Sequence, residues 1–155
     1  MYSRMESIVI QSDIVNMVLA ENFVDAICDE RHLDNYYATI SVPVLKAVEN
    51  AILFGSKNNS KSSVTLSCDY YRGGIVFTIQ APESCFAEIP NGDIPPAGSF
   101  QEAMFLVGML ADEVKPSDDG CSLQIKFAIQ GIKPEEAAQR IAVLEKFYMP
   151  EVVEA

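Results

Sequence analysis

The side chains of this chain best suited to chemistry are three polar groups inside the apolar stretch SVPVLKAVENAILFG, residues 41–55. They are Lys46, Glu49 and Asn50. Lys46 and Asn50 are four residues apart, so in a helix they lie on one face about a turn apart. An ammonium, a carboxylate and an amide can contact phosphate, act as a base and bind a metal ion. The same pattern also suits a core helix with a solvated polar edge, and the stretch alone leaves both interpretations open.

An amphipathic helix would hold these three groups in place. Its apolar residues recur at helical spacing, at Val44, Leu45, Val48, Ala51 and Ile52, and Gly55 follows where a helix often ends. The same period extends back to Tyr36, but Pro43 interrupts it, because a proline in a helix interior removes a hydrogen bond and clashes with the preceding turn. The helix therefore either begins near Ser41 or runs long and kinked through Pro43.

The rest of the chain predicts the element order β, α, α, β, β, loop, α, β, β, α. Strands are expected at 6–11, 63–71, 75–79, 112–116 and 121–129, and the other helices at 12–30, 100–111 and 134–148. Alternating apolar residues on both sides of the Arg72-Gly73-Gly74 turn indicate an antiparallel sheet with one covered face. We predict a single α+β domain over residues 1–155: a two-layer α/β sandwich whose mixed, mostly antiparallel sheet carries helices on one face.

The first predicted helix follows residues 6–11 directly. Ser12 is placed to cap its N-terminus, and Asp13 favours its first turn. The apolar residues at helical spacing, which predict the buried stripe of this helix, are Val15, Leu19, Phe23, Ala26 and Ile27.

Composition and charge exclude several classes of protein. The chain has 155 residues and 49% hydrophobic content, enough for one folded domain. Its net charge of −11 opposes binding to a phosphate backbone, so no nucleic-acid partner is expected. Four cysteines without CxxC spacing and a single histidine, His32, argue against zinc and suit buried thiols in a reducing compartment. With no signal peptide and no run approaching about 20 apolar residues, we expect a cytoplasmic protein without a membrane partner.

The segment KAVENAILFG, from Lys46 to Gly55, resembles the second helix of bacterial anti-sigma factor serine kinases, a branch of the GHKL (histidine kinase-like) ATPase superfamily. That helix typically reads E-A-x-x-N-A-I-x-H-G. The resemblance implies a histidine kinase-like ATPase fold, the long form of the helix, and a nucleotide pocket in which Asn50 would bind magnesium. Lys46 stands where the family has its general-base Glu, and Phe54 stands where it has His.

Other nucleotide-binding positions implied by this resemblance also depart from the family pattern. The matching residues are Ala81 for the Asp that reads adenine, Glu83 and Cys85 for two Gly, Phe86 for the family's Phe, and Gln101 and Ala103 for a later Gly-rich turn. A protonated amine such as that of Lys46 cannot accept a proton, and a side chain in place of Gly hinders the approach of a backbone amide to phosphate. The tail of the last motif, Leu110 to Val114, matches well. The positions typical of the family fold are therefore present, whereas those that bind and act on the nucleotide are replaced.

We therefore expect a degenerate anti-sigma-factor-like regulatory domain that acts by protein–protein contact, with no catalytic residues and no ATP turnover. By resemblance its partner would be a sigma factor or an anti-sigma antagonist, and a homodimer is also open. One alternative is an ATP-binding serine kinase that holds ATP and magnesium in an atypical site of Lys46, Glu49 and Asn50. Another is an unrelated α+β domain. In the degenerate site a partly buried Lys46 should pair with Glu49, Glu83 or Glu102, since an unpaired buried ammonium is costly, and such a pair would hold the flanking loops shut.

Overall fold

The computed structural model describes residues 6–33, 36–55, 59, 61–71, 73–86, 100–129, 139 and 142–143. In chain order its elements are β1 (Glu6–Gln11), the short 3-10 helix η1 (Ile14–Asn16), α1 (Met17–Glu30), α2 (Tyr37–Asn50), the π-helical segment η3 (Ala51–Gly55), β2 (Ser63–Tyr71), β3 (Gly74–Gln80), α3 (Phe100–Leu110), β4 (Glu113–Pro116) and β5 (Ser122–Ala128). This confirms the predicted order of elements as far as β5. The predicted last helix, 134–148, lies almost wholly outside the described residues.

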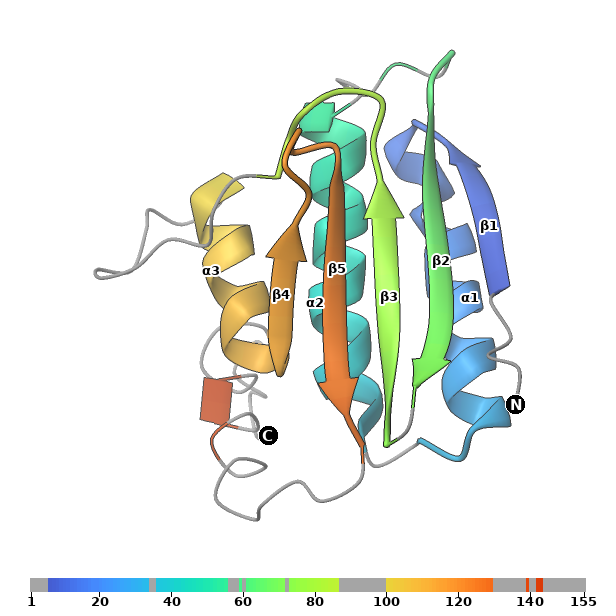
Figure 1. Cartoon of the computed structure of the whole chain (residues 1–155). Coiled ribbons are helices and arrows are strands. Elements are labelled where there is room, and N and C mark those ends of the chain that lie inside the picture. Colours follow the sequence, from blue (N-terminus) through green and yellow to red (C-terminus); the bar gives the residue numbers. More distant parts are fainter. Residues whose placement is uncertain are drawn as a thin grey trace, which may run out of the picture.

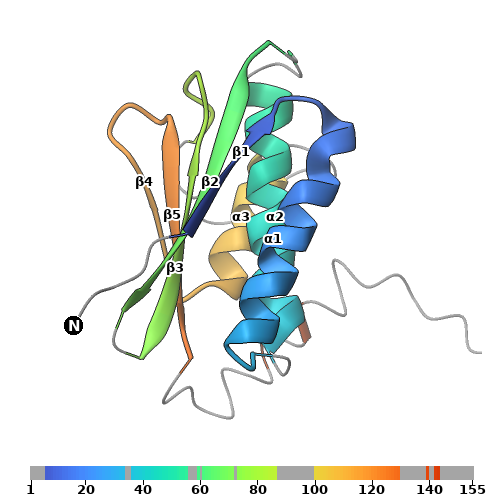
Figure 2. The same cartoon turned by 90° about the vertical axis from the view of Figure 1, so that its right-hand side faces the viewer.

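The strands form one five-stranded sheet in the order β1-β2-β3-β5-β4. The sequence had suggested a mixed, mostly antiparallel sheet. Among the described strands, however, all four strand pairs are antiparallel. The three helices lie together on one face of the sheet, with α2 between α1 and α3 (Figures 1 and 2). The predicted two-layer α/β arrangement is therefore correct, with helices on one face.

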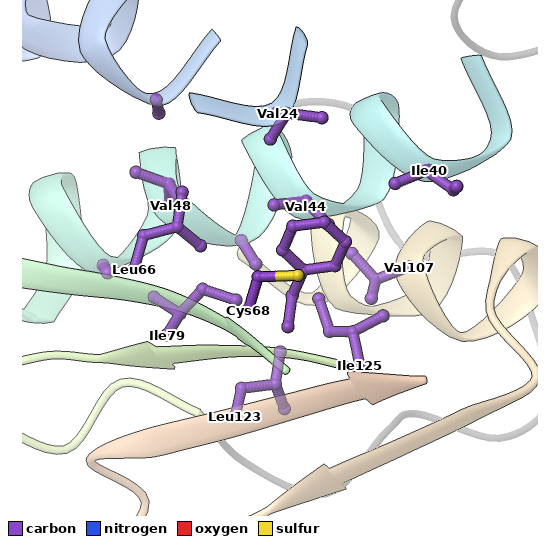
Figure 3. Close-up of a cluster of buried hydrophobic side chains, with 14 of the residues drawn as sticks. Val24, Ile40, Val44, Val48, Leu66, Cys68, Ile79, Val107, Leu123 and Ile125 are labelled. Atoms are coloured by element: carbon purple, nitrogen blue, oxygen red, sulfur yellow. The ribbon is translucent and has the colours of Figure 1, made fainter. Parts of the chain in front are cut away.

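Alternation along the strands builds the core between the two layers. On the helix side of the sheet the buried residues are Val64, Leu66 and Cys68 of β2, Ile75, Phe77 and Ile79 of β3, and Leu123, Ile125 and Phe127 of β5. Figure 3 shows side chains of these strands meeting Val44 and Val48 of α2 and Val107 of α3. Because side chains point to opposite faces in turn, each apolar residue at every second position is buried against the helices.

Helix α2 is the long form, and it runs through Pro43 in its interior. Pro43 has no N–H to donate to the Thr39 carbonyl, yet burial of the helix in the core outweighs that loss. By length and composition alone, the helical stretch Tyr37–Gly55 could cross a membrane. No stretch of this kind was expected from the sequence. In this structure 56% of that window is buried inside the protein, between the sheet and the neighbouring helices.

Helix α1 buries a different stripe from the one that the sequence predicted. Its buried residues are Ala20, Val24, Ile27 and Cys28, whereas Val15 is 72% exposed and Leu19 is 44% exposed. Of the predicted stripe only Ile27 is buried, and Phe23 is partly buried. The helix has apolar residues on two faces, and its period does not say which face meets the sheet.

The cap of this helical segment also differs from the sequence expectation. Asp13, not Ser12, is the N-cap residue, and its carboxylate accepts a hydrogen bond of 3.1 Å from the Val15 backbone N–H. Ser12 instead extends the pairing of β1, where its N–H donates to the Ser62 carbonyl. Ser12 is fully buried there, and its hydroxyl makes no hydrogen bond to the described residues.

Candidate functional site

Lys46 and Glu49 form an ion pair on the surface side of α2. The Lys46 Nζ atom lies 3.2 Å from Glu49 Oε1, and the two side chains are 33% and 37% exposed. Their spacing of three residues places them on neighbouring turns of one face. The prediction that Lys46 would be partly buried and paired with a carboxylate is confirmed. However, both residues belong to the same helix, so this pair does not tie a flanking loop to the site.

Asn50 follows Glu49 at the end of α2 but points in another direction. It is only 3% exposed, and its Nδ2 atom has no hydrogen-bond partner among the described residues. Consecutive residues of a helix project about 100° apart, which explains why Glu49 reaches solvent while Asn50 turns into the protein. Asn50 is therefore a buried amide with an unused donor, next to a solvated ion pair.

Gly55, at the end of η3, brings the helix into close contact with the segment after β3. A Cβ atom at this position would lie 2.6 Å from the Ala81 Cβ and 2.9 Å from the Cys85 Sγ. The Gly55 carbonyl also accepts a hydrogen bond of 3.0 Å from the Glu83 N–H. The helix can end here against this segment only because Gly55 has no side chain.

The segment of residues 81–86 is fixed on its other side by the turn between β4 and β5. The N–H groups of Cys85 and Phe86 both donate to the Gly120 carbonyl, at 3.0 and 2.9 Å, and the Ala81 N–H donates to the Cys121 carbonyl at 2.7 Å. Phe86 is buried and lines a cavity of about 380 Å³ with Ser84 and residues 116–120. Of Lys46, Asn50, Ala81 and Phe86, which the resemblance places in one nucleotide pocket, only Phe86 lines this cavity.

The remaining predicted positions divide between described and undescribed parts of the chain. Glu83 is exposed, and its backbone, not its carboxylate, makes the contact with Gly55. Gln101 and Ala103 lie in the first turn of α3. The segment 87–99, where the resemblance implies a lid over ATP, lies outside the described residues, as does the side chain of Glu102.

Sequence reasoning did not identify a second polar cluster, at the opposite end of β2. The Arg31 guanidinium lies 3.6 Å from the centroid of the Tyr70 ring, and the Tyr70 hydroxyl donates to Glu6 Oε2 at 3.0 Å. Burial is the main cause that raises the pKa of Tyr70 above its ordinary value. Arg31 and Tyr70 also line a cavity of about 210 Å³. No motif signals this cluster, since its members are distant in sequence.

The donor set around Asn50 does not fit magnesium–ATP. Magnesium takes oxygen ligands, and Asn50 can offer one amide oxygen, but it is only 3% exposed and the adjacent carboxylate of Glu49 is paired with Lys46. The ammonium of Lys46 cannot accept a proton, and the methyl side chain of Ala81 cannot accept a hydrogen bond. In addition, no group of three or more His, Cys, Asp or Glu in the described part of the chain could hold a metal ion. Comparison with protein-family models and with curated proteins gives no match for this chain.

Proposed function

We propose that this chain is a regulatory domain that acts by binding another protein and does not turn over ATP. The observation that carries the proposal is the Lys46–Glu49 ion pair. If the resemblance to the anti-sigma serine kinases holds, an ammonium occupies the place of the general base and engages the nearest carboxylate of the same helix. Phosphoryl transfer needs a group that orients or deprotonates the nucleophile, and a protonated amine at that position cannot accept a proton.

The packing at Gly55 gives independent support. Ala81 and Cys85 lie against the end of η3 at distances that leave no room for one extra methyl group on Gly55. In the family pattern glycines near this position let the backbone approach phosphate. Here the thiol of Cys85 and the methyl of Ala81 contact the helix end instead, and both side chains are apolar in character.

The alternative, an ATP-binding kinase with an atypical site of Lys46, Glu49 and Asn50, requires the last two side chains to act on one ligand. Glu49 is 37% exposed in its side chain, while Asn50 is 3% exposed as a residue. Two adjacent helical residues with such different surroundings do not converge on one metal ion without a change in backbone. We therefore favour the regulatory function, with a sigma factor or an anti-sigma antagonist as the expected class of partner.

A nucleotide titration tests this proposal directly. The purified full chain is heated with magnesium alone, with magnesium–ATP and with magnesium–ADP, and binding is measured in parallel by calorimetry. A ligand that binds only the native state adds about 2.7 kcal/mol of stability at a hundredfold excess over its dissociation constant. We expect equal melting temperatures in all three mixtures. A rise with ATP that is absent with magnesium alone would overturn the proposal and favour the atypical kinase.

Protein binding is measured separately. The chain is mixed with purified bacterial sigma factors, and complex formation is followed by sedimentation velocity with and without magnesium–ATP. The proposal expects a complex that forms equally well without nucleotide. A complex that requires ATP would contradict it.

A further inference from the structure

Two of the four free cysteines meet where the segment 81–86 packs on the turn between β4 and β5. Cys85 lies in that segment, and Cys121 follows the turn directly before β5. The two residues are distant in sequence and form no motif. Gly120 allows their approach, because its φ of +73° suits the turn and a Cβ atom there would lie 2.9 Å from the Phe86 carbonyl oxygen.

The backbone contacts limit the distance between the two Cα atoms. The Cys85 N–H donates to the Gly120 carbonyl at 3.0 Å, and that carbonyl belongs to the peptide bond that leads to Cys121. With standard bond lengths, the Cα atoms of Cys85 and Cys121 are then no more than about 7 Å apart. Disulfides usually span a Cα–Cα distance of about 4.4–6.8 Å, so a bond between these two residues needs little movement of the backbone.

The register of the sheet places Cys121 on the helix side. Ile79 of β3 pairs with Leu123 of β5, and both are buried on that side. Two residues further, Ala81 comes opposite Cys121, and the Ala81 N–H donates to the Cys121 carbonyl at 2.7 Å. Because side chains return to the same face at every second residue, Cys121 faces the helix side together with Ala81.

The thiol of Cys85 lies in the same region. A Cβ atom on Gly55 would be 2.6 Å from the Ala81 Cβ and 2.9 Å from the Cys85 Sγ, so these two side chains are neighbours. The pKa of the Cys85 thiol is raised to about 12, first by burial and then by the charge of Cys121 near it. Both thiols therefore lie beside Ala81, and rotation of the Cys85 side chain brings them within reach of each other.

The two thiols differ in their access to solvent. Cys85 is 8% exposed, whereas Cys121 is only partly buried. Since the thiolate is the reactive form, a buried thiol with a raised pKa reacts slowly, and an oxidant in solution meets Cys121 first. An accessible thiol beside a protected one is the arrangement in which the second thiol captures the oxidised form of the first.

We propose that Cys85 and Cys121 are a redox-sensitive pair that forms a reversible disulfide when the protein meets a peroxide. The bond ties the segment 81–86 to the start of β5. The structure shows the reduced state, which is the state expected in a reducing compartment. The inference concerns the thiols alone and does not rest on the proposed protein partner or on the absence of ATP turnover.

The reaction consumes one peroxide and releases two waters. The Cys121 sulfur attacks one oxygen of hydrogen peroxide, the O–O bond breaks, and water leaves, so that Cys121 becomes a sulfenic acid. The Cys85 sulfur then attacks the Cys121 sulfur, the S–O bond breaks, and a second water carries away the remaining thiol proton. The two sulfurs lose two electrons in total, which the peroxide gains. A dithiol reductant reverses the bond by thiol–disulfide exchange.

Bond formation changes the contacts of Cys85. In the reduced state its Sγ atom packs against Gly55 at the end of η3. To reach Cys121, the side chain has to turn away from η3, so a packing contact with the helix end is exchanged for a covalent bond to the neighbouring strand. Oxidation therefore fixes the segment to the sheet and releases one contact with the helix.

Oxidation of the full chain with a small excess of hydrogen peroxide tests the proposal. Free thiols are counted in denaturant, and linked peptides are identified by mass spectrometry without reductant. The wild type should fall from four free thiols to two, with Cys85 linked to Cys121 in the same chain, and dithiothreitol should restore all four. Four retained thiols, a link between other cysteines, or oxidation of Cys121 without a link to Cys85 would each overturn the proposal.

Three variants assign the roles of the two thiols. Cys121→Ser should keep its three remaining thiols under the same treatment, whereas the control Cys28→Ala, which removes a buried thiol of α1, should still lose two. Cys85→Ala should leave the sulfenic acid on Cys121 without a partner, where dimedone labels it. A loss of thiols in Cys121→Ser as large as in the wild type would contradict the pairing, and so would an unlabelled Cys121 in Cys85→Ala.

Thermal unfolding tests whether the bond fits the native fold. The oxidised chain should melt at a higher temperature than the reduced chain, because the bond restricts the unfolded state. Addition of dithiothreitol should return the melting temperature to that of the reduced protein. An oxidised chain that melts at a lower temperature would mean that the link forms only with the fold distorted, and would overturn the proposal.

Discussion

The ammonium of Lys46 lies 3.2 Å from Glu49 Oε1, three residues further along the same helix. This relationship decides how the polar face of α2 can act, because each group neutralises the other and both remain partly in solvent. The pair is local: it needs only the helix, and neither loop is involved. Its contribution to stability should accordingly be that of an ordinary helical ion pair.

A double-mutant cycle with Lys46→Met and Glu49→Gln measures that contribution. We expect a coupling energy of about 0.3–0.5 kcal/mol, since the pair is partly exposed and is screened by solvent and salt. The measurement is urea unfolding at two salt concentrations, and the coupling should shrink at the higher one. A coupling energy well above about 1 kcal/mol would show that the pair is part of a larger buried network.

Gly55→Ala should destabilise the protein by about 1–3 kcal/mol, because the new methyl group overlaps the Ala81 Cβ and the Cys85 Sγ. The matched double variant, Gly55→Ala with Ala81→Gly, removes the closer of these two contacts. It should recover part of the loss in denaturant unfolding. Full stability in the single variant would contradict the close packing of the helix end on the segment after β3.

Asn50→Leu should leave the free energy of unfolding unchanged or raise it. Asn50 is buried with an unpartnered Nδ2, and replacement of a poorly satisfied polar group by an apolar one of similar size is often neutral or favourable. Asn50→Asp is the contrasting variant, since it buries a carboxylate, and it should be clearly less stable at neutral pH. A large loss of thermal stability in Asn50→Leu would show that the amide makes an essential hydrogen bond.

The protein should lose stability at alkaline pH in part through two buried thiols. Burial raises the pKa of Cys68 and that of Cys85 from 9.0 to about 12. Between these values the unfolded chain has lost protons that the native state still holds, so the free energy of unfolding falls as the pH rises. Below pH 9 both states keep these protons, and the two thiols contribute no pH dependence.

In Cys85→Ala the free energy of unfolding should still fall as the pH rises above 9, but less steeply than in the wild type. The cost of the smaller side chain is the same at every pH, so the difference between the variant and the wild type should narrow from pH 8 to pH 11. Urea unfolding at several pH values checks this. A difference that stays constant with pH would mean that the Cys85 thiol ionises equally well in both states.

The sequence determined the strand pattern, and it gave Glu49 as one of three candidate partners for Lys46, with Glu83 and Glu102. Alternation at Val64, Leu66 and Cys68 placed those side chains on the covered face, and β2 and β3 pair through the turn at Gly73 as predicted. The structure pairs Lys46 with Glu49, the one of the three candidates that the helix itself brings close, because residues three apart are neighbours on a helix surface. These features follow from local geometry, which repeats with a fixed period and needs no distant partner.

Tertiary structure alone decided the features that depend on which surfaces meet. The two apolar faces of α1 are equivalent in the sequence, and packing on β1 and α2 buried Ala20 and Val24 while it left Val15 and Leu19 in solvent. Likewise, only the folded chain brings Ala81 and Cys85 against Gly55, and only the strand order leaves β1 at an edge. The spacing of apolar residues along the sequence indicates whether a segment is a helix or a strand. Which face of that element is buried depends on contacts between residues distant in sequence.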